Sequence, residues 1–267
     1  MRAVVTAAML LMAVAVSCNS WGFDLGDPVY RRDTGRTFRQ ELLYERFDRN
    51  IDDTSISFVI HDSGGSFGGS LSPDPDVIVR TAADVSLARS TWYLSEYFSV
   101  YGDLGAYNED SSDAKSSLLV GGGVRTVFLD AEPVVLSLQG HTHYCPGYDV
   151  SLRGDESGVG SYYSEGDVEL FELGGALIGA LVIEPADSLT TVYYVGGGVS
   201  IFHSQADLHA VYPDSGFSAD MRIKLRQESP FVLIGGVSLI MYERFSIRTE
   251  TRIGYESSLT AALGFLY

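Results

Sequence analysis

Basic residues are scarce in this chain, and lysine is nearly absent. The 267 residues include 18 Lys+Arg against 35 Asp+Glu, so 18 − 35 gives a net charge of −17, and the only lysines are Lys115 and Lys224. A field of this sign repels the phosphate backbone of nucleic acids. The composition therefore excludes binding of nucleic acid through a generally basic surface.

Long apolar runs are also missing beyond the first 20 residues. No later stretch approaches the roughly 18 to 20 apolar residues that a membrane-spanning helix needs. Yet 45% of the residues are hydrophobic and 29 are glycine, a composition too apolar for a disordered acidic protein. The chain must therefore bury or cover its apolar residues by another arrangement.

The N-terminus has the features of an export signal. Arg2 is followed by an apolar core from Val4 to Val16 and then by small residues, the pattern of a cleaved secretory peptide. We expect cleavage after Ser20, with a site near Ala13 and Ala15 as an alternative. Acylation of Cys18 in a lipobox of residues 15–18 is a third reading. If Cys18 is removed, Cys145 is the only thiol and no internal disulfide forms.

The chain after the signal alternates between apolar and polar residues with a period of two. In the segment Phe245–Tyr255, Phe245, Ile247 and Ile253 share one face, and Arg248 and Glu250 share the other. This period is typical of β-strands. Ten segments are assigned as strands, namely residues 37–47, 79–87, 98–107, 118–128, 134–144, 171–183, 192–202, 231–241, 245–255 and 258–267. Residues 37–47 also fit a short amphipathic helix.

The connections between these segments alternate between short and long. Four are short (Trp92–Glu96, Ala131–Pro133, Glu184–Ser188 and Tyr242–Arg244), and four are long and polar (Ile51–Asp76, Asn108–Ser116, Cys145–Asp167 and Asp207–Pro230). Short turns at one end and long loops at the other are typical of barrels in outer membranes. Hydrocarbon tolerates no unpaired backbone edge. We therefore predict an all-β fold, an antiparallel up-and-down transmembrane β-barrel of about ten strands over residues 37–267, with eight and twelve strands as alternatives, preceded by a periplasmic segment of residues 21–36.

The last two segments carry a resemblance to a known class. The strands Arg244–Arg252 and Ser258–Tyr267 resemble those of Gram-negative outer-membrane β-barrel proteins, in particular the small OmpA-like and opacity-protein-like barrels of the porin family. In that class a C-terminal aromatic residue preceded by alternating apolar residues is the signal for the barrel-assembly machinery, and Leu263, Phe265 and Tyr267 match it. Ala262 stands where that class often has glycine.

The resemblance implies a location in the cell outer membrane and a surface-exposed protein. Its implied partners are outer-membrane lipid, lipopolysaccharide and the barrel-assembly machinery. A soluble lipocalin-like barrel that binds a ligand is the main alternative, because it shows the same alternation with its apolar face turned inward. The terminal aromatic residue, the unequal connections and the frequent glycine favour the membrane barrel.

The polar faces of the strands predict the contents of the lumen. Charges inside a narrow barrel must be paired or hydrated, so they form either a filled core or the lining of a small pore. The predicted lumen charge network consists of Arg80, Asp84, Asp103, Arg125, His141, His143, Glu172, Arg248, Glu250 and Arg252. We expect a structural or surface-exposed role, with a narrow porin as a further option, and no enzymatic activity, cofactor or metal.

Two features keep other chemistry open. His141 and His143 lie on one strand face, and two imidazoles are either half of a hydrolase site or an incomplete metal site. An outer-membrane hydrolase built on these histidines is therefore an alternative function. The acidic residues of the long connections offer contacts for divalent cations, although no segment has the spacing of a calcium-binding loop.

Overall fold

The protein is described from a computed structural model, which covers residues 37–51, 53–62, 64–71, 79–109, 116–156, 160–213, 216–226, 231–254 and 256–267. The expected signal, the Cys18 site and the segment 21–36 lie outside the described residues. Within the described ranges, no helix is long and apolar enough to cross a membrane.

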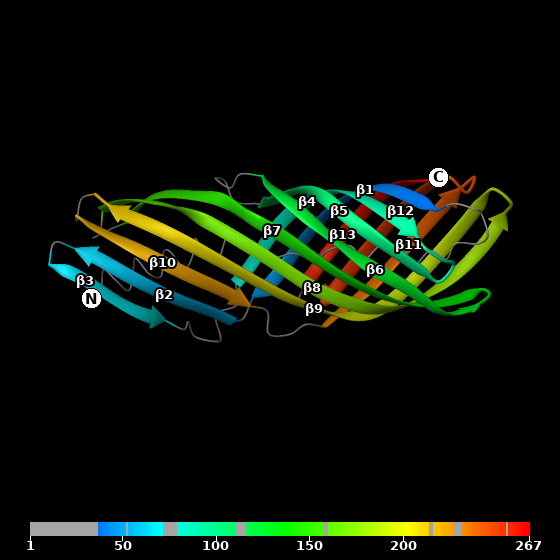
Figure 1. The fold of residues 1–267 in the computed structure, drawn as a ribbon, viewed down its shortest axis with the longest axis horizontal. Coiled ribbons are helices and arrows are strands. Elements are labelled where there is room, and N and C mark those ends of the chain that lie inside the picture. The colour runs from blue at the N-terminus through cyan, green and yellow to red at the C-terminus, as the bar shows by residue number, and fades with distance from the viewer. Residues whose placement is uncertain are drawn as a thin grey trace.

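Thirteen strands make up the described fold (Figure 1). They are β1 (Phe38–Ile51), β2 (Asp53–Asp62), β3 (Gly65–Leu71), β4 (Val79–Tyr93), β5 (Phe98–Glu109), β6 (Ser117–Ala131), β7 (Val134–Glu156), β8 (Gly160–Ala186), β9 (Leu189–Tyr212), β10 (Phe217–Arg226), β11 (Phe231–Met241), β12 (Phe245–Gly254) and β13 (Glu256–Leu266). All pairings are antiparallel.

Ten of these strands close into a barrel. The order is β1, β4, β5, β6, β7, β8, β9, β11, β12 and β13, and β13 pairs again with β1. The predicted ten-stranded antiparallel barrel is confirmed, and residues 37–47 belong to a strand rather than a helix. The four predicted short connections are tight turns, and Thr37 at the start of the barrel donates its backbone N–H to the carbonyl of Tyr267, at 3.2 Å.

Three predicted long loops are largely strands, which corrects the prediction. Residues 51–76 contain β2 and β3, residues 207–230 contain β10, and residues 145–167 lengthen β7 and β8. Beyond the closed barrel, the parts of β7, β8 and β9 that extend past it form an open six-stranded sheet with β10, β2 and β3. This sheet, at the left in Figure 1, is here called the extension. The acidic residues of these segments suggested loops, whereas described ones such as Glu165, Asp167 and Asp207 lie on the exposed face of alternating strands.

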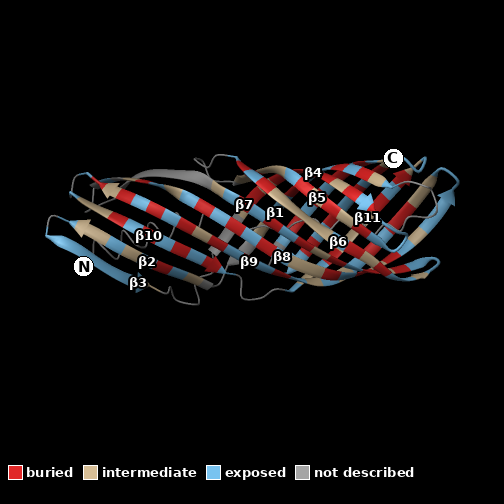
Figure 2. Cartoon of the chain, in the orientation of Figure 1, coloured by how far each residue is buried: buried red, intermediate tan, exposed pale blue. Residues whose placement is uncertain are grey.

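The polarity of the two strand faces reverses between the barrel and the extension, as β9 shows, although the same alternate positions point outward along the whole strand. In the barrel half, Tyr193, Val195, Val199 and Ile201 point outward and are exposed. In the extension half, the outward positions hold His203, Gln205, Asp207 and His209, and the inward ones hold the buried Ala206, Leu208 and Ala210. Figure 2 shows this alternation along the strands.

The barrel therefore has an apolar outside and buries its charges inside, beside an apolar cluster that includes Ile178, Tyr194 and Ile234, whereas the extension has the polar outside of a protein in water. Apolar outward residues surrounding buried charges are the pattern of a barrel in hydrocarbon. The alternative of a soluble lipocalin-like barrel, which needs an apolar interior throughout, is wrong. A strand rises about 3.3 Å per residue, so a tilted apolar stretch of about ten residues spans a band of roughly 25 Å.

Aromatic rings gather at the short-turn end of the apolar band. Phe38 lies beside Trp92 and Tyr267, with ring centroids 5.6 Å and 6.1 Å apart, and Phe245 lies 5.3 Å from Phe265. Aromatic residues at this level are typical of the boundary between hydrocarbon and headgroups. The position of the rings marks the short-turn edge of the band.

The change from an apolar to a polar outward face predicts effects of very different size for one substitution at two outward positions. Leu177 points outward from the middle of the band, and Leu177→Arg should cost about 2–4 kcal/mol of folding free energy in lipid vesicles. Gln205→Arg, on the outward face of the extension, should change it by less than about 0.5 kcal/mol. Urea titration of both variants in vesicles measures this, and equal effects would contradict the assigned band.

Candidate functional site in the barrel lumen

Among the described residues, the barrel interior contains as many buried arginines as buried carboxylates. Five arginines and five carboxylates face inward, each at most 5% exposed: Arg39, Arg89, Arg125, Arg248 and Arg252, with Glu41, Glu45, Asp103, Glu172 and Glu250. Their charges sum to 5 − 5, which is zero, although the whole chain carries −17. The excess negative charge of the protein therefore lies outside this set.

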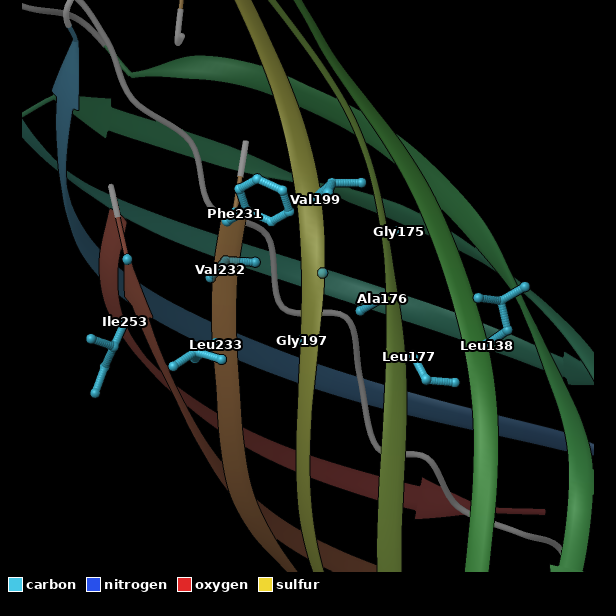
Figure 3. Close-up of a pocket in the computed structure, with 12 residues that line it drawn as sticks. Leu138, Gly175, Ala176, Leu177, Gly197, Val199, Phe231, Val232, Leu233 and Ile253 are labelled. Atoms are coloured by element: carbon cyan, nitrogen blue, oxygen red, sulfur yellow. The ribbon is translucent and has the colours of Figure 1, made fainter. Parts of the chain in front are cut away.

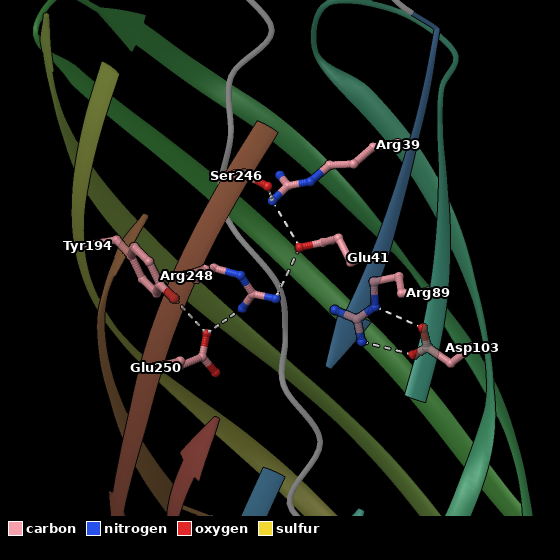
Figure 4. A network of polar contacts seen from close by, with 8 residues as sticks. All are labelled: Arg39, Glu41, Arg89, Asp103, Tyr194, Ser246, Arg248 and Glu250. Carbon is pink, nitrogen blue, oxygen red and sulfur yellow. Dashed lines mark hydrogen bonds and ion pairs between the residues drawn. The ribbon is translucent and has the colours of Figure 1, made fainter. Parts of the chain in front are cut away.

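One network joins β1 to β12 (Figure 4). Arg39 donates from Nη2 to the Ser246 hydroxyl, at 2.9 Å, and lies 2.9 Å from Glu41 Oε1. The same Glu41 oxygen accepts from Arg248 Nη2, at 3.4 Å. Arg248 Nη1 lies 3.5 Å from Glu250 Oε2. Cations and anions thus alternate along a chain of contacts on the inner face of the barrel, from β1 past β13 to β12.

Glu250 has two further partners in this network. Its Oε1 accepts from Arg252 Nε at 3.1 Å, and its Oε2 accepts from the Tyr194 hydroxyl at 3.0 Å. The period of two along β12 places Arg248, Glu250 and Arg252 side by side on the inner face. Because a buried charge without a partner is costly, the alternation of sign along the strand stabilises all three.

A second network begins on the neighbouring strand β4, where Arg89 pairs across the strands with Glu41 of β1. Arg89 binds Asp103 with two parallel hydrogen bonds of 2.8 Å, from Nε to Oδ1 and from Nη2 to Oδ2. The guanidinium of Arg89 also stacks 4.2 Å from the centroid of the Tyr101 ring. His143 Nε2 lies 2.8 Å from Asp103 Oδ2. The two parallel hydrogen bonds between Arg89 and Asp103 are the strongest form of an arginine–carboxylate pair.

The neighbouring histidine has a different carboxylate. His141 Nε2 lies 3.3 Å from Glu172 Oε1, and Ser200 donates to the same oxygen at 2.6 Å. The two imidazole centroids are 5.5 Å apart. Inward-facing glycines make room for them, because a Cβ on Gly121 would overlap the His143 ring and one on Gly174 would overlap the His141 ring.

Eight of the ten predicted lumen residues are placed in the interior, where they are buried: Asp103, Arg125, His141, His143, Glu172, Arg248, Glu250 and Arg252. Asp84 corrects the prediction, because it faces outward. It accepts a hydrogen bond from the Tyr44 hydroxyl at 2.7 Å and lies 3.4 Å from Arg46 Nη1. The Arg80 side chain lies outside the described part of β4.

The Asp84 error arises because the inward face of β4 is apolar near the extension and polar in the barrel. Near the extension, the inward face of β4 packs against an apolar core, and its inward residues there are Ala83, Val85 and Leu87. The polar face of this stretch, which was assigned to the lumen, is the outer face. Above the charge networks the interior is an apolar core, formed by residues including Leu43, Leu87, Tyr107, Leu119, Leu170, Phe202, Leu208 and Ile223.

Several lumen residues were not predicted, although the sequence contained their signal. Arg39, Glu41 and Glu45 alternate with the exposed Leu42 and Tyr44 in β1, a clear period of two. The competing helical interpretation of residues 37–47 hid it. Arg89 continues the inward face of β4 two residues beyond the predicted end of the strand at Leu87.

A chain of polar side chains also crosses the outer face of the extension. Asp220 Oδ1 lies 2.6 Å from His209 Nδ1, Asp220 Oδ2 lies 3.0 Å from His61 Nε2, and His61 Nδ1 lies 2.8 Å from the Ser66 hydroxyl. The hydrogen bond from His209 lowers the pKa of Asp220. These contacts connect β9, β10, β2 and β3 on an open face, where the Asp220 side chain is 57% exposed.

Two of the acidic residues that the sequence offers to divalent cations have protein partners. Asp207 lies 2.6 Å from Arg222 Nε, and this hydrogen bond lowers the pKa of Asp207. Asp62 accepts from the backbone N–H of Gly64 at 2.6 Å. Among the described residues, no group of three or more histidine, cysteine or acidic side chains is placed to hold a metal ion.

A hollow of about 850 Å³ lies on the outward face of β7, β8, β9, β11 and β12 (Figure 3). Gly175, Gly197 and Gly198 form its floor, and Leu177, Phe231 and Leu233 are among its walls. It lies within the apolar band and faces away from the charge networks. It therefore provides no route to the histidines of the lumen.

Comparisons with known proteins give only distant similarity. No family model matches the chain, and no curated protein matches it. Solved structures with related shapes include the outer membrane protease OmpT from Escherichia coli (9% identity, TM-score 0.43, covering 90% of this chain and 100% of that one) and the translocator domain of the autotransporter NalP from Neisseria meningitidis (13%, 0.39, 88% and 90%). The toluene transporter TbuX from Ralstonia pickettii is another (10%, 0.31, 87% and 90%). At these TM-scores no function follows for this chain, and the OmpA-like resemblance stays a prediction.

The fit of glycine against histidine predicts a position-specific effect of adding one methyl group. Gly121→Ala should lower stability by about 1–3 kcal/mol, because the His143 ring has to move within a packed interior. Gly140→Ala is the matched control, since its Cβ would have 3.8 Å to the nearest atom. Urea unfolding in vesicles compares the two, and equal stabilities would refute the packing described for His143.

The Arg89–Asp103 pair predicts a large difference between breaking and replacing a buried ion pair. Asp103→Asn should cost about 3–5 kcal/mol, because it removes the buried carboxylate that Arg89 binds with two hydrogen bonds. The double variant Arg89→Met/Asp103→Leu should recover most of that loss, since apolar residues of similar size often substitute for a buried pair. The same unfolding measurement decides, and a double variant as unstable as Asp103→Asn would contradict the interpretation.

Proposed function

We propose that the protein is an outer-membrane β-barrel with a filled lumen, which serves a structural and surface-exposed role. The observation that carries this proposal is the change of polarity along continuous strands, whose outward face is apolar in the barrel and polar in the extension. The barrel half fits hydrocarbon and the extension fits water. With the short turns on the periplasmic side, the extension stands outside the cell.

The balance of charge in the lumen favours a filled barrel over a narrow porin. A pore that selects ions presents an excess of one charge along an aqueous path. Here five arginines face five carboxylates, and these side chains are almost fully buried. Ten strands also leave an interior only slightly wider than that of the eight-stranded barrels that side chains fill.

The arrangement of the histidines disfavours the alternative of an outer-membrane hydrolase. A hydrolase needs a nucleophile whose proton passes to a histidine. In the lumen each of His141 and His143 contacts a carboxylate, and Ser200 donates to Glu172 rather than to an imidazole. Both imidazoles are buried. We therefore propose that the lumen is not catalytic.

The partners proposed for the barrel follow from its surface. The apolar band contacts outer-membrane lipid, and the extension lies at the level of lipopolysaccharide. Leu263, Phe265 and Tyr267 point outward and are about half exposed or more. They are therefore accessible to the barrel-assembly machinery as a terminal signal.

Two measurements on the expressed protein test this proposal. It should fractionate with outer membranes and migrate differently on a gel before and after heating, as barrels that resist detergent do. In a planar bilayer it should show no stepwise conductance, in contrast to an open porin inserted under the same conditions. A fully soluble protein would contradict the membrane assignment. Regular conductance steps would show that the barrel is an open pore rather than a filled one.

A further inference from the structure

Strand β3 is an open edge of the extension. It pairs with β2, and no other described strand pairs with it. Residues 65–70 are all exposed, including the Phe67 ring at 66%. The strand Gly65–Leu71 contains no charged residue and no proline. The backbone N–H and C=O groups on its free edge can therefore pair with another strand, and no charged side chain or proline of β3 opposes this.

The opposite edge of the same sheet has a different composition. The upper part of β7, from residue 148 onward, pairs with β8 but has no partner among the described strands on its other side. Its sequence contains Asp149, Arg153, Asp155 and Glu156. Charged residues on an edge are the usual protection against pairing with a further strand. Of the two described edges of the extension, β3 is the one whose sequence has no such residue.

Strand β3 is held in place by side chains on both of its faces. On the outer face, Ser66 contacts His61, which is connected through Asp220 to His209. On the inner face, the Phe58 ring covers Gly69 and lies 6.4 Å from the Phe67 ring. An edge that is ordered in advance loses little conformational entropy when it pairs.

We propose that β3 pairs with β3 of a second copy of this chain, antiparallel, in the register that uses all seven residues. This register places Gly68 opposite Gly68 of the second copy and Phe67 opposite Gly69 of the second copy. A large side chain thus meets a position without one on each side of the two-fold axis. The uncharged strand also lets two chains of net charge −17 approach at this edge.

The antiparallel pairing determines how the two barrels are oriented. The strands of the extension run along the long axis of the molecule, with the barrel at one end (Figure 1). Because the paired strands run in opposite directions, the two barrels lie at opposite ends of the dimer. If the barrel is in an outer membrane, as proposed above, the contact joins copies in two facing membranes rather than neighbours in one. A single seven-residue contact is weak, but many copies between two surfaces act together.

Disulfide capture in detergent tests the pairing independently of any membrane. Gly68→Cys fits the structure, because its Cβ would have ordinary contacts of 3.4 Å and 3.6 Å, and the natural Cys145 is buried. In the proposed register the two introduced thiols face each other, so oxidation should give about tenfold more linked dimer than Gln205→Cys, which lies three strands from the edge. Equal yields from the two variants would overturn the pairing while leaving the barrel assignment intact.

Clustering of vesicles tests the orientation. Vesicles that contain the full mature chain should aggregate, as measured by light scattering. Gly68→Lys should abolish this, because it places like charges directly opposite each other across the two-fold axis. Gln205→Lys adds the same charge away from the edge and should leave clustering unchanged. Linked dimers that form only within single vesicles would refute the facing-membrane geometry, and a chain that fails to insert would instead refute the proposed function.

Discussion

The fold depends on the requirement that no backbone group be left unpaired in hydrocarbon. A sheet satisfies this only when it closes, which is why β13 returns to β1 across eleven residue pairs and why the ten barrel strands form one cycle. Closure then leaves one face of each strand toward lipid and the other toward a narrow interior. The apolar residues occupy the first face, so the polar residues have to share the second. Every charge in the lumen, from Arg39 to Arg252, is a consequence of this division, and each needs a nearby opposite charge.

The same strands stop obeying this division once they leave the band. In water a sheet buries its apolar side, so the inward positions of β8, β9 and β10 become Val168, Leu208 and Ile223. The outward positions become acidic and basic, as in the Asp207–Arg222 pair. The extra strands β2, β3 and β10 are compatible only with this upper region, because an open edge cannot exist in lipid. One continuous sheet thus fits both hydrocarbon and water, and the polarity of its outward face changes within single strands.

Period-two alternation was sufficient to predict the ten barrel strands, because one face of each is nearly uniform over about ten residues. The inward positions of Asp103, Glu172 and Arg248 followed from it. Asp84 did not, because the inward face of a strand changes from polar to apolar where the surroundings of the strand change, and a local pattern contains no information about those surroundings. The partners within the lumen were also beyond prediction. Arg89 meets Asp103 across neighbouring strands, but Arg39 and Ser246 are 207 residues apart in sequence and meet only because the barrel closes.

The charge networks explain how the interior can be both polar and specific. An apolar filling of the lumen would have been compatible with many registers, since apolar contacts are not directional. Alternating arginines and carboxylates are satisfied in few registers, because a shift of one residue would turn every inward charge toward lipid. A shift of two would place Arg248 beside a different partner and remove the Glu41 bridge between β1 and β12. The networks thus select the register at the closing seam of the barrel, where β1 and β13 come from opposite ends of the chain. The inward glycines act with them, because Gly121 and Gly174 admit the two imidazoles at only one alignment of the neighbouring strands.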